Sequence, residues 1–187
     1  MRNKSDNKKQ REIEFNHEKL NKMETNRSKT VVLMLSHHYP KTAIHAGKPT
    51  HFKEKLLDGR KIHTCRGRYD GWASNIDKVN DKGYVMSVRE WDGRPYGKGV
   101  KQKVIKEYRK AGYQRFTMKY NRDTDELKCV IDGKRFTDIA TLAKNDGMTL
   151  EEFKDWFFGQ GMSRDIYSGI IIHFTDFRYN SEHSTNP

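Results

Sequence analysis

The stretch from Phe52 to Arg66, read FKEKLLDGRKIHTCR, constrains the fold of this chain more than any other segment. Its first half places apolar residues at helical spacing, and Gly59 is the residue type that often follows the end of a helix. Past the glycine the spacing becomes that of a strand. The segment therefore predicts a helix over residues 50–58, ended by the glycine and followed directly by a strand.

The glycine and the expected strand over Lys61–Arg66 together carry the pattern G-x-K-x-x-T-x-R, formed by Gly59, Lys61, Thr64 and Arg66. A period of two places Thr64 and Arg66 on one face of the strand and Lys61 on the other. A lysine, a hydroxyl and a guanidinium delivered so close together form a candidate site for a small polar ligand. The spacing by itself does not say that a ligand binds there.

A helix followed by G-x-K-x-x-T-x-R resembles the signature of the ASCH domain, a PUA-like β-barrel family associated with RNA and modified nucleosides. A second segment, Leu142–Trp156, resembles the acidic residue, short turn and amphipathic helix that members carry before their last strand. The resemblance covers Thr30–Tyr179, with no specific motif over residues 92–135. It implies an α+β fold, with a small PUA-like open β-barrel of five to seven strands and a few short helices.

Some members of this family are similar to amidohydrolases that remove an acetyl group from N4-acetylcytidine. By position, the resemblance implies a nucleophile at Thr64, a general base at Lys61 and a third catalytic group at Asp146, where the family has a glutamate. A lysine acts as a base only if burial or nearby positive charge lowers its pKa from about 10.4. The shorter acid loses about 1.5 Å of reach. Whether Asp146 supports catalysis in place of glutamate stays open.

The favoured interpretation is a protein that binds RNA or a modified nucleoside in the same pocket, and amidohydrolase activity is the alternative. Lys61 and Arg66 would hold a phosphate or a base edge, and Asp146 would accept from an exocyclic amine. A ribonuclease, with Lys61 and Arg66 stabilising charge on a scissile phosphate, is a third and weaker alternative. Further candidate contacts near the motif are Gly59, Trp72, Arg89, Glu90, Trp91 and Tyr96.

The charge of the chain favours a polyanionic partner. Lysine and arginine outnumber aspartate and glutamate by 37 to 25, which gives a formal net charge of +12 at pH 7. Such a surface favours nucleic acid first, although lysine-rich surfaces also serve solubility alone. The expected partner is therefore RNA or a modified nucleoside, and the oligomeric state is left open.

The cysteines and apolar runs favour a reduced cytoplasmic protein. Cys65 and Cys129 lie far apart without C-x-x-C spacing, and no apolar run approaches the ~20 residues of a membrane helix. No membrane partner and no cofactor are expected. No metal is expected either, because the clustered histidines match no metal-binding spacing. These histidines are His37, His38, His45, His51 and His63.

The organisation predicted along the chain is a disordered basic arm over residues 1–29, one domain over residues 30–179 and a tail over residues 180–187. Thr137 is expected to cap a helix, and Thr149 with Glu152 fits the capping box of another. The segment Tyr69–Lys82 is ambiguous. Strands are expected at Val31–Leu35, 84–91, Lys103–Tyr108, Gln114–Tyr120, Leu127–Ile131 and 169–177, with a hairpin turn at 132–133.

Overall fold

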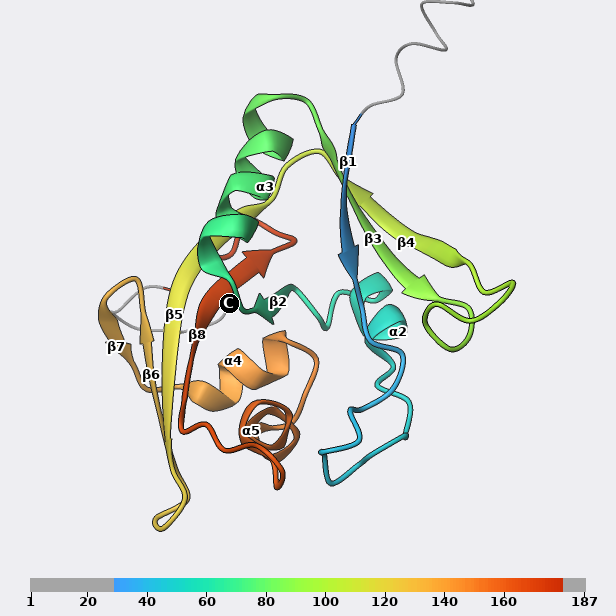
Figure 1. Cartoon of the computed structure of the whole chain (residues 1–187). Coiled ribbons are helices and arrows are strands. Elements are labelled where there is room, and N and C mark those ends of the chain that lie inside the picture. The colour runs from blue at the N-terminus through green and yellow to red at the C-terminus, as the bar shows by residue number, and fades with distance from the viewer. Residues whose placement is uncertain (1–28, 180–187) are drawn as a thin grey trace, which may run out of the picture.

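The computed structural model describes residues 29–179, which form an α+β fold with eight strands and four helices (Figure 1). The α+β class expected from the sequence is confirmed. The arm expected before residue 29 and the tail from residue 180 lie outside the described residues. The elements are β1 (Thr30–Met34), α2 (Phe52–Leu57), β2 (His63–Arg66), α3 (Tyr69–Asp81), β3 (Val85–Trp91), β4 (Gln102–Tyr108), β5 (Gly112–Asn121), β6 (Glu126–Ile131), β7 (Lys134–Phe136), α4 (Ile139–Asn145), α5 (Leu150–Phe158) and β8 (Ile166–His173).

The strands form two separate sheets within residues 29–179. In the smaller sheet the order is β1-β3-β4, with β1 parallel and β4 antiparallel to β3. The larger sheet has the order β2-β8-β5-β6-β7, and each neighbouring pair is antiparallel. Neither sheet closes on itself. Helix α3 contacts strands of both sheets, and α2 lies beside β1 and β3 (Figure 1).

Among residues 29–179, no helix combines the length and apolar character of a membrane span.

Helix starts follow from local capping chemistry. At α5 the Thr149 side chain accepts from the Glu152 backbone while Glu152 accepts from the Thr149 N–H, so the predicted capping box is confirmed. The predicted cap of α4 is wrong by one residue. Asp138, not Thr137, accepts from the Thr141 N–H at 3.0 Å, because Asp138 is the residue that directly precedes the first helical turn.

Burial accounts for the conformation of two elements, α3 and β8. The ambiguous segment is α3, which buries Ala73, Ile76 and Val79 at three-residue spacing. Strand β8 lies between β2 and β5 and is fully buried over Ile170–Ile172, as its continuous apolar run predicts. The core therefore lies around β8, and β2 is an edge strand that leaves one side open to other contacts.

A pair of buried histidines faces each other across the β2–β8 ladder. His63 and His173 are register partners, both are 0% exposed, and their ring centroids lie 5.7 Å apart. Burial lowers the pKa of His173 to about 2 and the pKa of His63 well below its ordinary value. The His63 Nε2 lies 2.8 Å from the Tyr179 hydroxyl. Neither ring nitrogen of His173 has a hydrogen-bond partner within residues 29–179.

This pair predicts a loss of stability in mild acid. The unfolded chain takes up protons on these histidines near pH 6.5, whereas the folded chain does not, so the free energy of unfolding falls as pH drops below that value. The expected slope is about 1.4 kcal/mol per pH unit for each histidine. Replacing His173→Phe removes one of these groups and its unpaired nitrogens. Urea denaturation between pH 7 and pH 5 should show a smaller loss for this variant than for wild type.

The exposed histidine His38 provides a matched control, because its side chain is solvated in both states. The His38→Gln variant should lose stability in acid as wild type does. An unchanged pH slope in His173→Phe would contradict the prediction.

Candidate functional site

The signature residues lie where α2 ends and β2 begins. Gly59 has a φ of 83°, a left-handed conformation that a glycine adopts without steric cost, and it ends α2 as the sequence predicts. The chain then turns back so that the Lys61 N–H donates to the Lys55 carbonyl at 2.7 Å. The next residue, Ile62, donates to the Asn145 carbonyl at 2.9 Å. This contact brings the end of α4 against the start of β2.

Lys61 and Asp146 form a buried ion pair at that junction. Their exposed fractions are 1% and 2%. The Lys61 Nζ donates to the Asp146 Oδ1, and also to the Asp146 carbonyl at 2.5 Å. The same ammonium lies 4.2 Å from the ring centroid of Phe52 on α2. The structure therefore brings together the lysine and the distant carboxylate that the resemblance implied.

The pair has two consequences for the chemistry of β2. Burial lowers the pKa of Lys61; Asp146 acts in the opposite direction and Arg66 in the same direction as burial. The second carboxylate oxygen, Asp146 Oδ2, accepts from the Cys65 N–H at 3.2 Å. Because β2 is an edge strand, this carboxylate takes the place of a neighbouring strand.

Thr64 and Arg66 form a second part of the junction. The Arg66 Nη1 donates to the Thr64 Oγ1 at 2.6 Å and to the Cys65 carbonyl at 2.8 Å. Its Nη2 donates to the Met34 carbonyl at 2.9 Å, at the end of β1. Arg66 thus joins the two sheets through backbone carbonyls. The Thr64 side chain is buried, and within residues 29–179 no base accepts its hydroxyl proton.

Three side chains at the junction have the donor types of a zinc site. A nitrogen of His63, the sulfur of Cys65 and a carboxylate oxygen of Asp146 lie within 4.8 Å of one another. However, the oxygens of Asp146 are already engaged by Lys61 and by the Cys65 N–H. Burial also raises the pKa of the Cys65 thiol well above its ordinary value, so it stays protonated. The arrangement fits an ion pair closed by an ammonium group better than a metal centre.

Two adjacent cavities share part of their lining. The smaller has a volume of about 270 Å³ and is bordered by Phe52 and Leu35. The larger has a volume of about 660 Å³. His37, Lys53 and Glu90 line both. Together the cavities, called the double cavity below, have the size of a nucleoside-binding pocket.

The ion pair of Lys53 and Glu90 lines both halves of the double cavity. The Lys53 Nζ, from α2, donates to the Glu90 Oε1, from β3, at 2.9 Å. The Glu90 side chain is 10% exposed and the Lys53 side chain 42%. Glu90 raises the pKa of Lys53, mainly through this hydrogen bond, so the ammonium stays charged at neutral pH.

Aromatic and basic side chains border the larger half. His37 and His38 lie with ring centroids 4.5 Å apart, and Trp91 lies 5.1 Å from Tyr96. Tyr96 is 90% exposed and has a φ of 61° in the turn where the Gly97 N–H donates to the Arg94 carbonyl. Glycine is the usual residue at such a position, so the turn presents a tyrosine at a conformational cost. The larger half is also lined by Arg94, Lys103 and Asp92, and the Lys103 Nζ lies 3.9 Å from the Asp92 Oδ2.

The structure therefore divides the residues selected from the sequence into separate groups. Glu90 and Trp91 line the double cavity, with Tyr96 against Trp91. Arg89 donates to Ser87 Oγ at 2.9 Å instead, and the partly buried Trp72 packs against the core. The buried Lys61, Thr64 and Asp146 form the junction together with the half-buried Arg66, and Gly59 shapes the turn that leads to it.

Sequence reasoning missed the basic residues of the double cavity. Lys53, Arg94 and Lys103 belong to a chain with 37 lysines and arginines, so composition cannot single them out. The position of Lys53 beside the motif residue Phe52 is the one local indication that the sequence offers.

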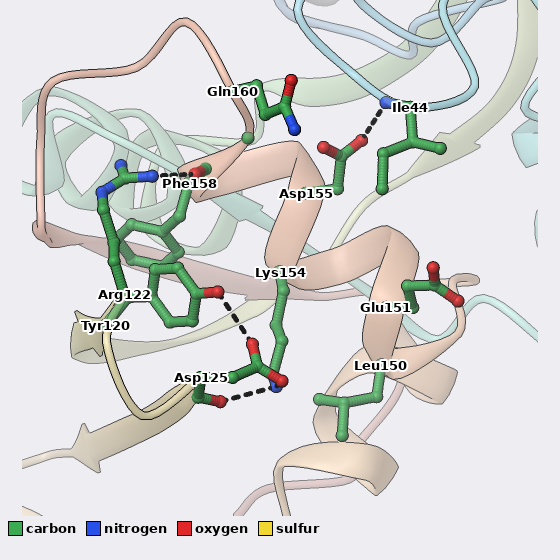
Figure 2. Close-up of a pocket in the computed structure, with 11 residues that line it drawn as sticks. Ile44, Tyr120, Arg122, Asp125, Leu150, Glu151, Lys154, Asp155, Phe158 and Gln160 are labelled. Carbon is green, nitrogen blue, oxygen red and sulfur yellow. Dashed lines mark hydrogen bonds and ion pairs between the residues drawn. The ribbon is translucent and has the colours of Figure 1, made fainter.

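A third cavity, of about 580 Å³, lies between α5 and the β5–β6 turn (Figure 2). Of its charged side chains, all except Glu151 have partners within residues 29–179. Lys154 donates to Asp125 at 2.8 Å, and Asp155 accepts from the Ile44 N–H at 2.6 Å. Arg122 donates to the Phe158 carbonyl at 3.1 Å. These contacts hold the hairpin and the loop around Ile44 against α5, which makes them supports of the fold.

Comparison of the chain with protein-family models, with curated proteins and with solved structures finds no match.

The buried pair predicts a large stability effect at one position. Replacing Asp146→Ala leaves the Lys61 ammonium buried without its partner and frees the Cys65 N–H, so the free energy of unfolding should fall by about 3–5 kcal/mol. Chemical denaturation at pH 7 measures this loss. The exposed Asp58–Arg60 pair is the matched control, and Asp58→Ala should change stability little. Equal effects of the two substitutions would contradict the assigned role of the buried pair.

Proposed function

We propose that this chain is an RNA- or nucleotide-binding protein of the ASCH type, with a PUA-like arrangement of its sheets and the double cavity as its ligand site. The observation that carries the proposal is the lining of that cavity. A largely buried carboxylate at Glu90 lies beside cations at Lys53, Arg94 and Lys103, in a space of nucleoside size. These groups match the polar edge of a base and a phosphate.

Each part of a nucleotide has a matching group in the double cavity. A base in the larger half would lie against the rings of His37 and His38, with its edge toward Glu90. Its phosphate would lie near Arg94 and Lys103 at the border. The next base of a strand would stack on the exposed ring of Tyr96, which packs against the half-buried Trp91.

In this proposal the signature residues hold the site in place. Lys61 lies against one side of the Phe52 ring, and Phe52 borders the smaller half of the double cavity. Asp146 fixes Lys61, and Arg66 fixes β2 to β1. The motif residues would thus support Phe52 in the wall of the cavity, while the residues that line the cavity would contact the ligand.

The proposal predicts salt-dependent binding to single-stranded RNA. The logarithm of the affinity should fall linearly with the logarithm of salt concentration, with a slope of about 0.7 for each phosphate neutralised. Replacing Arg94→Gln or Lys103→Gln should reduce that slope by about one phosphate contact each. Fluorescence anisotropy of a labelled oligonucleotide at several salt concentrations measures both effects.

Lys128→Gln is the control for that experiment, because Lys128 lies on β6 and pairs with Glu126 away from the double cavity. Its slope should equal that of wild type. Absence of RNA affinity even at low salt would overturn the proposed function.

Amidohydrolase activity remains a second candidate because of one observation. Burial lowers the pKa of Lys61, which a lysine base requires, and Asp146, the third group that the resemblance implies, lies in contact with it although its charge raises that pKa. Thr64 would have to exchange its hydrogen bond from Arg66 for one to a base before it could attack an acyl group.

This second candidate predicts release of cytidine from N4-acetylcytidine, at a rate that rises with pH as Lys61 loses its proton. Chromatography of the products measures the rate. Thr64→Ala should abolish it, and Thr117→Ala, on β5, should leave it unchanged. A wild-type rate no higher than that of Thr64→Ala would exclude the activity.

A further inference from the structure

The Glu90 carboxylate has unused hydrogen-bonding capacity that faces the double cavity. Its Oε1 accepts from the Lys53 Nζ at 2.9 Å, whereas its Oε2 accepts from no residue in the part of the chain that the structure describes. The side chain is only 10% exposed, yet it lines both cavities. A nearly buried carboxylate with a free oxygen at a cavity is placed to accept from a ligand N–H group.

Lys53 and Glu90 together present a directional pattern to a ligand. The ammonium of Lys53 offers donors, and the two oxygens of Glu90 next to it offer acceptors. A carboxylate accepts up to about four hydrogen bonds, so its bond from Lys53 leaves room for a ligand on both oxygens. The resulting order, donor then acceptor then acceptor, is also the order along the Watson–Crick edge of cytosine.

One RNA base has the edge that complements this order. Guanine presents the acceptor O6, then the donors N1–H and N2–H. Uracil would place its O2 acceptor against a carboxylate oxygen, and cytosine would place its amino group against the ammonium. Adenine would place its N6–H donor against the Lys53 ammonium and its N1 acceptor against a carboxylate oxygen of Glu90. A polar group left without its partner in such a site lowers affinity strongly.

We infer that the Lys53–Glu90 pair makes the double cavity selective for guanine, an inference that rests on the proposed nucleotide site. Lys53 donates to O6, and the two oxygens of Glu90 accept from N1–H and N2–H. Arg94 and Lys103 contact the phosphate whatever the base is, so they supply affinity without selectivity. Specificity and affinity thus come from different residues of one cavity.

Calorimetric titration with the 5′-monophosphates of guanosine, inosine, uridine, cytidine and adenosine at low salt tests this inference. GMP should bind about 10- to 100-fold more tightly than UMP, CMP or AMP. IMP lacks only the 2-amino group of guanine, so it loses the bond to one oxygen and should bind about tenfold more weakly than GMP. This comparison uses the wild-type protein and does not depend on any variant folding.

Glu90→Gln adds the matched test of the carboxylate. The amide keeps the shape but replaces one acceptor by a donor, so affinity for GMP should fall to that for UMP while UMP binding changes little. Glu126→Gln is the control, since Glu126 is an exposed carboxylate on β6 that lines neither half of the double cavity, and it should bind GMP as wild type does. Equal affinity of wild type for GMP, IMP and UMP would overturn the guanine selectivity alone. Absence of binding to every nucleotide and to RNA would overturn the proposed site as well.

Discussion

The buried ion pair between Lys61 and Asp146 is the interaction on which the surrounding structure depends. It joins the end of α4, the open edge of β2 and the Phe52 ring of α2. Because a buried charge without its partner is strongly unfavourable, the two residues hold these elements at fixed positions. The turn after Asp146 fits the same requirement: Gly147 has a φ of 82°, and a side chain there would begin 3.4 Å from the Lys61 Cβ.

The junction connects two sheets that have no strand pairing between them in the described part of the chain. Arg66 bridges the carbonyls of Cys65 and Met34, and thereby links β2 to β1. The double cavity lies next to this link between the sheets, and residues of α2 and β3 line it. The proposed ligand site is therefore separate from the signature: Lys61 and Thr64 are buried and bonded to Asp146 and Arg66, whereas one oxygen of Glu90 accepts no hydrogen bond within residues 29–179. This division explains how a motif can mark the position of a site without forming its contacts.

Local features were predictable where neighbouring residues settle the structure by themselves. The Thr149–Glu152 capping box, the hairpin between β6 and β7 and the buried run of β8 all follow from short-range chemistry. The segment that became α3 was ambiguous because Ala73, Ile76 and Val79 form a weak apolar stripe, which becomes decisive only when two sheets cover it. The cap of α4 was misplaced because Thr137 and Asp138 are both good capping residues.

By itself, the sequence determined the helix stop at Gly59, the basic charge and a short strand after the glycine. The expected strand over Lys61–Arg66 was too long at its start: β2 begins at His63, because the backbone N–H groups of Lys61 and Ile62 donate to Lys55 and Asn145 instead of to a strand. Only the tertiary structure decided the partners: Lys61 meets a carboxylate 85 residues away, and Lys53 meets one 37 residues away. The reason is physical. Backbone conformation and capping depend on adjacent residues, whereas a buried charge pair or a cavity depends on how distant layers pack. That packing buried Lys61 and Thr64 at the junction, and it placed Lys53, which the sequence did not single out, beside Glu90 in the lining of the double cavity.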